Sequence, residues 1–147
     1  MKKRISLLLV GLFCLSSIAL ADSERRINIE RLPPMAKSLV FECFNEDEIL
    51  IVKQEKDDNK CSYEVLLRDG TKMEFNRRGE LVEVENEKAG VPFQLIPRKI
   101  RNYVLRRFSE DVFILEYERD RKGYEIKLSN DLEIEFDNQF RVREIDD

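Results

Sequence analysis

The sequence predicts an α+β fold in which two helices pack on one face of an antiparallel sheet and leave the other face open. Three observations support this prediction. The chain carries one pattern twice, each copy opens with an amphipathic helical segment, and each copy continues with alternating strands. Each copy is expected to supply one helix and four antiparallel strands. The predicted architecture is therefore a tandem repeat of two helix-plus-four-strand units.

An export signal precedes the repeats. Residues 1–21 run from a basic start through an apolar stretch to the small residues around Ala21, which predicts cleavage after Ala21. A retained membrane anchor is disfavoured because the apolar stretch is short for a span. Lipoprotein processing at Cys14 is disfavoured because the bulky Phe13 precedes it. We expect a periplasmic or secreted mature protein without stable membrane insertion.

The repeats set the domain boundaries. Leu32-Pro33 returns as Ile96-Pro97, and Tyr63-Glu64 returns as Tyr124-Glu125. The repeats are expected to form one domain because the mature chain of about 126 residues has the size of one ordinary domain. The predicted segments are an N-terminal tail (22–31), repeat 1 (32–86), a linker (87–95) and repeat 2 (96–147).

Each repeat is expected to begin with a helix. Pro33 and Pro34 suit the first turn of the first helix, and Arg106 and Arg107 suit the last turn of the second. Apolar residues recur three and four positions apart in both segments, which predicts one buried stripe per helix. The first stripe contains Met35, Ala36, Leu39, Val40, Cys43 and Phe44, and the second contains Ile96, Ile100, Tyr103, Val104 and Phe108.

The strands of the second repeat are predicted from period-two alternation. Phe113, Leu115 and Tyr117 are expected to face the core, while Ile114 and Glu116 face outward. A hairpin centred on Arg121 and Lys122 would pair Tyr117 with Tyr124, and the next turn would pair Leu128 with Ile134. The same pairing in the first repeat puts Leu50 opposite Leu66, and Val52 opposite Glu64, on the outward face.

This layout resembles the PepSY-like proteins exported by Bacteroidetes, which are also described as β-lactamase-inhibitor-like. The resemblance covers the mature chain and rests on the motif residues Pro33, Pro97, Phe44, Phe108, Asp69-Gly70, Glu74-Phe75-Asn76 and Glu135-Phe136-Asp137. The second copy departs from it with Asn130-Asp131 and Phe140 where the first has Asp69-Gly70 and Gly79. The resemblance implies a β-lactamase-inhibitor-like fold and a protein-binding or inhibitory role, but carries over no active site or cofactor.

Composition excludes several functions. The chain contains no histidine and no tryptophan, which removes imidazole acid-base chemistry and histidine metal sites. Its formal net charge is −4 and becomes more negative once the basic signal is cut, so general nucleic-acid binding is not expected. Cys43 and Cys61 are expected at distant points, which favours separate thiols over a disulfide. We predict a protein that is not an enzyme and needs no cofactor.

The open face of the first repeat is the leading candidate for protein contact. It is expected to present an apolar cluster with a polar rim, a common form of contact site for an envelope or extracellular protein. Alternatively, the tail or the linker residues Val91, Phe93 and Leu95 cover the cluster. The candidate contact residues are Leu50, Val52, Glu64, Leu66, Arg68 and Glu74.

The open face of the second repeat offers an alternative, because its outward positions are mostly acidic. Such a face could bind a basic partner, a small ligand or a cation, although no regular metal-ligand loop is present. Hydrolysis by a pair of these carboxylates would need a substrate pocket. The sequence shows no recognisable sign of one. The candidate ligand-binding residues are Glu116, Glu125, Glu133, Glu135 and Asp137, with Glu118 on the same face.

Overall fold

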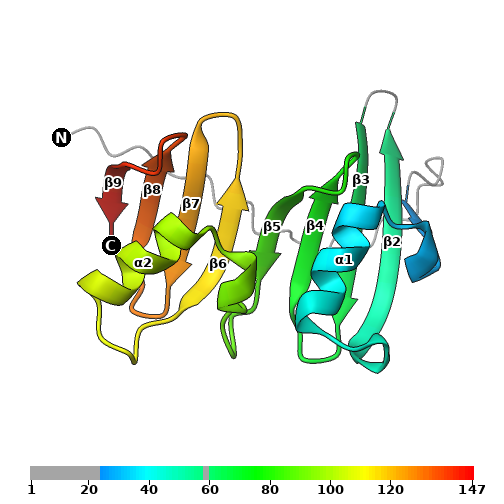
Figure 1. Cartoon of the computed structure of the whole chain (residues 1–147), viewed down its shortest axis with the longest axis horizontal. Coiled ribbons are helices and arrows are strands. Elements are labelled where there is room, and N and C mark those ends of the chain that lie inside the picture. The colour runs from blue at the N-terminus through cyan, green and yellow to red at the C-terminus, as the bar shows by residue number, and fades with distance from the viewer. Residues whose placement is uncertain (1–23, 58–59) are drawn as a thin grey trace, which may run out of the picture.

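A computed structural model describes residues 24–57 and 60–147, so the signal segment and its cleavage point lie outside the described residues. The described strands form one antiparallel sheet in the order in which they follow along the chain (Figure 1). They are β1 (Glu24–Arg26), β2 (Ile49–Asp57), β3 (Lys60–Leu67), β4 (Lys72–Asn76), β5 (Leu81–Glu85), β6 (Ile114–Arg119), β7 (Gly123–Leu128), β8 (Glu133–Asp137) and β9 (Val142–Asp146).

Two α-helices, α1 (Pro34–Cys43) and α2 (Arg98–Arg107), lie on the same face of this sheet (Figure 1). Strands β2–β5 follow α1 and β6–β9 follow α2, and the pairing of β5 with β6 makes the sheet continuous. No described helix lies on the other face. Neither helix in the described ranges has the length and apolarity of a bilayer span. Short 3₁₀ turns are η1 (Ile29–Arg31), η2 (Glu46–Glu48) and η3 (Phe93–Leu95).

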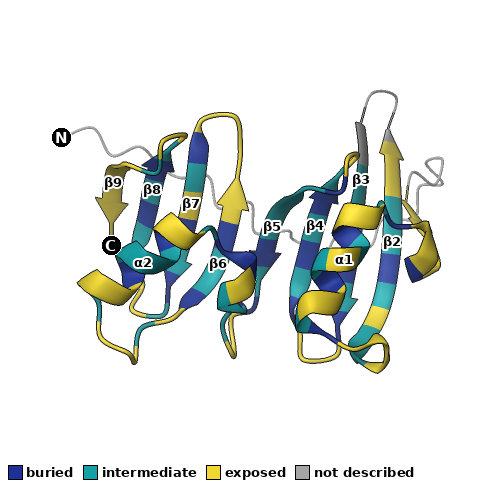
Figure 2. Cartoon of the chain, in the orientation of Figure 1, coloured by how far each residue is buried: buried dark blue, intermediate teal, exposed yellow. Residues whose placement is uncertain are grey.

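The hydrophobic core lies between the helices and the sheet (Figure 2). Val40 of α1 and Ile100 of α2 are fully buried, as the helical stripes predict. Met35 is the exception, because 59 % of it is exposed. The linker does not cover the open face, since its Val91 and Leu95 are buried in this core. The tail adds β1 to the sheet by pairing with β2.

A β-bulge in β2 corrects the expected register of the first hairpin. Ile49 pairs with Leu67 and Ile51 pairs with Leu66, so the extra residue on β2 is Leu50. An extra residue moves every later side chain of the strand to the opposite face. Val52 therefore pairs with Val65 and is buried in the core, whereas the sequence pattern had placed it outward.

A second bulge, between Ile114 and Glu116 in β6, corrects the expected faces of the second half. Ile114 is fully buried and Phe113 is 39 % exposed, the reverse of the prediction. Tyr117 does face the core, but it pairs with Ile126 rather than Tyr124.

The turns on either side of β7 account for the rest of the register error. The turn after β6 is centred on Arg121 and Lys122, as predicted, and the Asp120 side chain accepts backbone hydrogen bonds there from Lys122 at 2.6 Å and Gly123 at 3.0 Å. With this centre, Arg119 and not Tyr117 is the partner of Tyr124. At the following turn, Ile126 rather than Leu128 pairs with Ile134. Both errors shift the partner by two positions, so the predicted face is kept while the predicted neighbour is wrong.

Asn86 makes a buried polar contact at the end of β5, next to the seam between β5 and β6. Asn86 and Thr71 are both buried, and the Asn86 amide donates a hydrogen bond of 2.9 Å to the Thr71 hydroxyl. The backbone N–H of Asn86 also donates to the carbonyl of Leu115 at 2.8 Å. The end of β5 is thereby fixed to both β4 and β6.

Candidate functional site

A continuous line of glutamates crosses the open face of the sheet. Each member is the direct register partner of the next, so one glutamate stands on every strand from β3 to β9. Like charges directly opposite each other destabilise a sheet. Stabilisation of the fold therefore does not explain why glutamates occupy these positions. We call this line the glutamate row, and its members are Glu64, Glu74, Glu83, Glu118, Glu125, Glu135 and Glu144.

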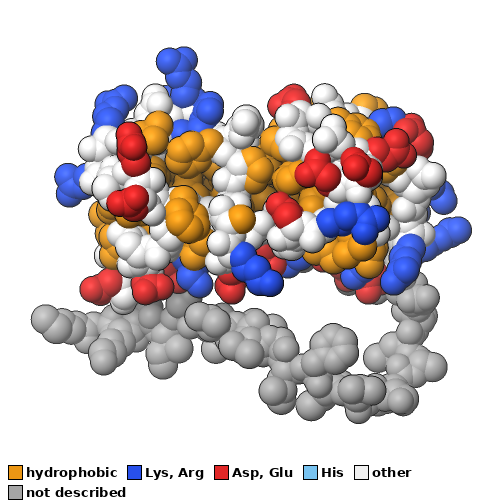
Figure 3. Space-filling model, turned by 90° about the horizontal axis from the view of Figure 1, so that it is seen from below, with side chains coloured by type: hydrophobic (Ala, Val, Ile, Leu, Met, Phe, Trp, Pro, Cys, Tyr) orange, Lys and Arg blue, Asp and Glu red, His pale blue; other side chains and the backbone are white. Residues whose placement is uncertain are grey.

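A second outward line runs beside the glutamate row and is more mixed. It contains the apolar pair Ile51 and Leu66 on β2 and β3, followed by positions of both charges. Its members from β4 to β9 are Lys72, Glu85, Glu116, Lys127, Glu133 and Asp146. Acidic residues therefore outnumber basic residues on the open face. Figure 3 views the molecule from below, along the end of the sheet, and shows charged side chains of both signs among patches of hydrophobic side chains.

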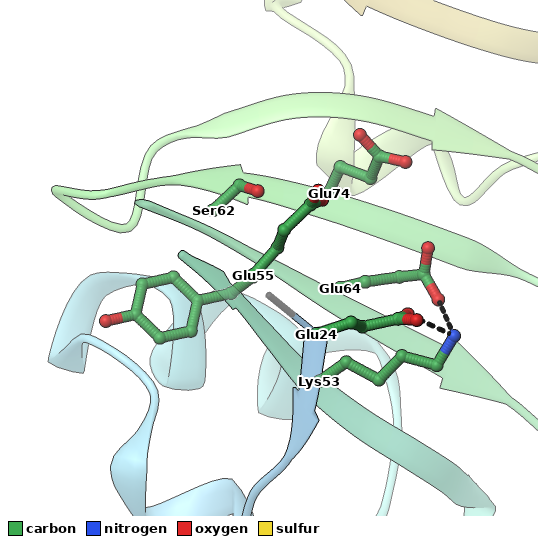
Figure 4. A pocket seen from close by; sticks show the side chains of 7 residues that line it. Glu24, Lys53, Glu55, Ser62, Glu64 and Glu74 are labelled. Carbon is green, nitrogen blue, oxygen red and sulfur yellow. Dashed lines mark ion pairs between the residues drawn. The ribbon is translucent and has the colours of Figure 1, made fainter. Parts of the chain in front are cut away.

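Lysines neutralise the glutamate row at its β2–β4 end. Lys53 lies 2.7 Å from Glu24 and 3.3 Å from Glu64, and both carboxylates point toward its ammonium group (Figure 4). These residues line a shallow hollow of about 40 Å³. This volume is far below that of small-molecule sites, and charged side chains dominate the lining.

Lys72 of β4 is the central cation of the open face. Its ammonium lies 3.0 Å from Glu85, 3.4 Å from Glu74 and 3.7 Å from Glu83. Partial burial disfavours its charge, but the surrounding carboxylates outweigh burial and raise the pKa of Lys72. The ammonium group of Lys72 is therefore held by the carboxylates next to the seam between β5 and β6.

The row lacks such neutralisation from β6 onward. Among the ion pairs of the described chain, none involves Glu118, Glu125 or Glu135. Partial burial and then the charge of Glu118 raise the pKa of Glu125 to about 7. Partial burial and the neighbouring acids Asp120 and Glu74 also raise the pKa of Glu118. In this part of the face, the acids therefore repel one another without a paired lysine among the described residues.

Three carboxylates converge where the two halves meet. Glu83 and Glu85 of β5 and Glu116 of β6 each offer an oxygen within 4.8 Å of the others. Partial burial, followed by the charge of Glu74, raises the pKa of Glu83 to about 7. Partial burial and the charge of Glu85 raise the pKa of Glu116. The group could hold a hard cation such as Ca²⁺, which prefers several oxygen ligands.

The structure separates the predicted contact residues of the first repeat. Leu50 is 50 % exposed on its bulge, Leu66 is half-buried beside Ile51, and Val52 is in the core. Glu64 and Glu74 lie in the glutamate row. Arg68 instead donates a hydrogen bond from Nε to the Asp47 carbonyl at 2.6 Å. The apolar cluster expected from Leu50, Val52 and Leu66 is therefore not formed.

The predicted acidic residues of the second repeat are largely brought together. Glu125 and Glu135 are opposite each other in the glutamate row, and Glu116 and Glu133 flank Lys127 in the second line. Asp137 is set apart, because it pairs with Arg141 at 2.6 Å and accepts backbone hydrogen bonds in the β8–β9 turn.

Sequence reasoning missed the part of the site contributed by β5. Glu83 and Glu85 alternate with Val82 and Val84 in a readable strand pattern, but the pairing of β5 with β6 was not predicted. The alternation alone could have placed both glutamates outward. Their convergence with Glu116 depends on a strand pairing that no local pattern specifies.

The fold and this face define an open-faced α+β sheet protein. A family model described as "Putative beta-lactamase-inhibitor-like, PepSY-like" matches residues 61–144. The chain belongs to this PepSY-like family. No curated protein matches the sequence.

Solved structures from Bacteroides are similar over most of the chain. A "putative periplasmic protein" of the DUF2874 family from Bacteroides vulgatus is 36 % identical, with a TM-score of 0.79. A "putative calcium-regulated periplasmic protein" from Bacteroides thetaiotaomicron has the same identity and TM-score. Each alignment covers 87 % of this chain and 100 % of the relative.

Another periplasmic protein from Bacteroides vulgatus, described as of unknown function, is 32 % identical with a TM-score of 0.73. Its alignment covers 84 % of this chain and 99 % of that one. These relatives support a periplasmic location for this chain, while cleavage after Ala21 stays a prediction.

Proposed function

We propose that this protein is an exported, non-catalytic binding module that binds a basic partner protein through the open face of its sheet. The observation that carries the proposal is the glutamate row from β6 onward, where Glu118, Glu125 and Glu135 have no cation of the described chain paired with them. Proteins that break a local stability rule commonly do so at functional sites. A basic partner would relieve this repulsion.

The family and the fold are consistent with this function. The β-lactamase-inhibitor-like description points to a protein that acts by binding. Inhibition or regulation of an envelope or extracellular enzyme is the form of binding that we favour. The proposed contact surface differs from the apolar cluster inferred from the sequence, because Val52 is in the core.

Affinity capture from periplasmic extract tests this proposal. The test variant is Glu118→Gln/Glu125→Gln/Glu135→Gln. The control variant, Glu42→Gln/Glu110→Gln/Asp111→Asn, removes the same charge from exposed positions on α1 and in the loop after α2. We expect a basic protein to be retained by the wild type and the control but lost by the test variant. Equal retention by all three proteins would contradict binding through the sheet face.

A second candidate function is Ca²⁺ binding by Glu83, Glu85 and Glu116. Two observations favour it: their oxygens lie within 4.8 Å of one another, and one relative is described as calcium-regulated. Calorimetric titration with CaCl₂ should show binding by the wild type and by Glu42→Gln/Glu110→Gln. Loss of binding in Glu83→Gln/Glu85→Gln would support this site, and unchanged binding would exclude it.

We also infer that the two halves are copies of one structural unit. Bulges occur at comparable points of β2 and β6. Further bulges lie at Val82 in β5, opposite Glu74 and Phe75 of β4, and at Arg143 in β9, opposite Glu135 and Phe136 of β8. Phe75 and Phe136 are both buried beneath the helices. On this interpretation, duplication gives one broad face on which a partner meets the strands of both copies.

A further inference from the structure

We propose that the glutamate row binds a basic α-helix that lies across strands β5–β8 with its lysines or arginines in a single stripe. This inference rests on the proposed function, because it specifies the form of the partner at the same face. The facing residues are Glu83, Glu118, Glu125 and Glu135, which are consecutive register partners. The negative charge of the row calls for a positively charged partner. The spacing of the carboxylates decides which partner conformation fits.

The spacing of the row fits a helix better than an extended chain. Neighbouring strands are about 4.8 Å apart, so carboxylates recur at that interval along the row. A helix rises about 5.4 Å per turn and places residues three and four apart on one stripe. Three steps accumulate a mismatch of roughly 2 Å, which flexible glutamate and lysine side chains can absorb.

An extended strand fits poorly across the same row. Its side chains on one face repeat about every 6.7 Å, so three steps displace its charges by roughly 6 Å from the carboxylates. Such a segment could pair with one or two glutamates but not with consecutive members. A helical stripe can therefore use the continuity of the row where a strand cannot.

Two features select the β5–β8 part of the row. Sheet twist rotates the outward direction by about 20–25° per strand, so a straight helix can follow only about four strands. At the β3–β4 end, Lys53 and Lys72 already pair with Glu64 and Glu74, and Lys72 also lies 3.7 Å from Glu83, so Glu83 is the facing residue that a partner shares with Lys72. Glu118, Glu125 and Glu135 form no ion pair within the described chain, so their carboxylates can pair with the cations of a partner.

Three designed peptides of about 18 residues, long enough for five helical turns, test this inference. The first carries four lysines in one helical stripe, and the second has the same composition with the lysines distributed around the helix. The third has the same charge in a proline-containing extended sequence. Binding is measured by fluorescence anisotropy at pH 8 and roughly 50 mM salt, where screening is moderate. The proteins are the wild type, Glu118→Gln/Glu125→Gln/Glu135→Gln and Glu42→Gln/Glu110→Gln/Asp111→Asn.

We expect the striped helix to bind wild type and control about tenfold more tightly than either other peptide, because three exposed ion pairs together contribute about that factor. The sheet-face variant should lose this preference. Equal binding of all three peptides, lost in the sheet-face variant, would overturn the helix inference but keep the basic-partner function. Failure of every peptide to bind wild type would contradict both.

Discussion

Glycine at position 123 is required by the close approach of strands β7 and β8. Its φ is +150°, and a Cβ there would lie 1.9 Å from the carbonyl oxygen of Phe136. This position opens β7 and pairs with Asp137. A side chain could fit only if the two strands separated, so the turn at Asp120 and the register of β7 both depend on Gly123.

We predict that Gly123→Ala destabilises the protein by at least ~3 kcal/mol, because the added methyl overlaps backbone rather than a flexible side chain. Urea denaturation followed by circular dichroism measures the effect. Gly70→Ala is the matched control, since φ there is +92° but nothing lies within 4 Å of the added Cβ. It should cost only the backbone strain of about 1 kcal/mol. Equal losses in the two variants would show that the β7–β8 contact is unimportant.

Val52 and Leu50 show how the extra residue of the β2 bulge decides which side chains contribute to stability. Val52→Asp buries an unpaired charge and should prevent folding or cost about 4 kcal/mol. Leu50→Asp should change stability by less than about 1 kcal/mol, because Leu50 is 50 % exposed. Thermal unfolding of the two variants checks this difference. Similar melting temperatures of the two variants would contradict the assignment of Leu50 as the bulge residue with Val52 in the core.

At the scale of elements, the sequence predicts what is local. The helical stripes place Val40, Ile100 and Val104 correctly in the core because side-chain periodicity follows directly from helix geometry. The outward alternation of Glu133 and Glu135 in β8 likewise follows from strand geometry.

What the sequence did not predict depends on contacts between elements. The bulges at Leu50 and Leu115 leave no distinct residue signature, so the faces of Val52, Phe113 and Ile114 were wrong. β5 pairs with β6 where the two halves meet, and no hairpin turn connects these two strands. The acidic composition of the face was therefore predictable, whereas its continuity across both halves was not.

The seam itself offers an element-scale prediction. Thr71→Val removes the hydroxyl that accepts the hydrogen bond of the buried Asn86 amide. Leaving that donor unpaired should destabilise the protein by ~1–2 kcal/mol. Chemical denaturation of Thr71→Val measures this cost, with Thr71→Ser as the control that keeps the hydroxyl. A loss in the serine variant as large as that in the valine variant would mean that packing, not the hydrogen bond, is responsible.

At the scale of the whole molecule, partial burial of glutamates and charge repulsion on the open face should make stability depend on pH. The pKa values of Glu83 and Glu125 rise from 4.5 to about 7 in the folded protein. Between these values the folded state binds protons more strongly than the unfolded state. The free energy of unfolding should therefore fall as pH rises from about 5 to 8.

We expect this loss to be ~1–2 kcal/mol, after allowance for solvent screening of these half-exposed groups. Thermal unfolding across the pH range measures it, and Glu83→Gln/Glu125→Gln should flatten the dependence. Glu42→Gln/Glu110→Gln provides the matched control. A wild-type melting temperature that is constant or increases over this interval would contradict the assignment.

The last strand also has a consequence for how the protein behaves at high concentration. β9 is an edge of the described sheet, and every one of its residues is exposed (Figure 2). Its unpaired backbone groups are a template on which another chain could add a strand. Arg143, Glu144 and Asp146 put charge along that edge, and Glu144 would bring a further like charge to any acidic strand laid against it. We expect this edge to oppose aggregation, so the protein can keep a wide exposed sheet and still remain dispersed.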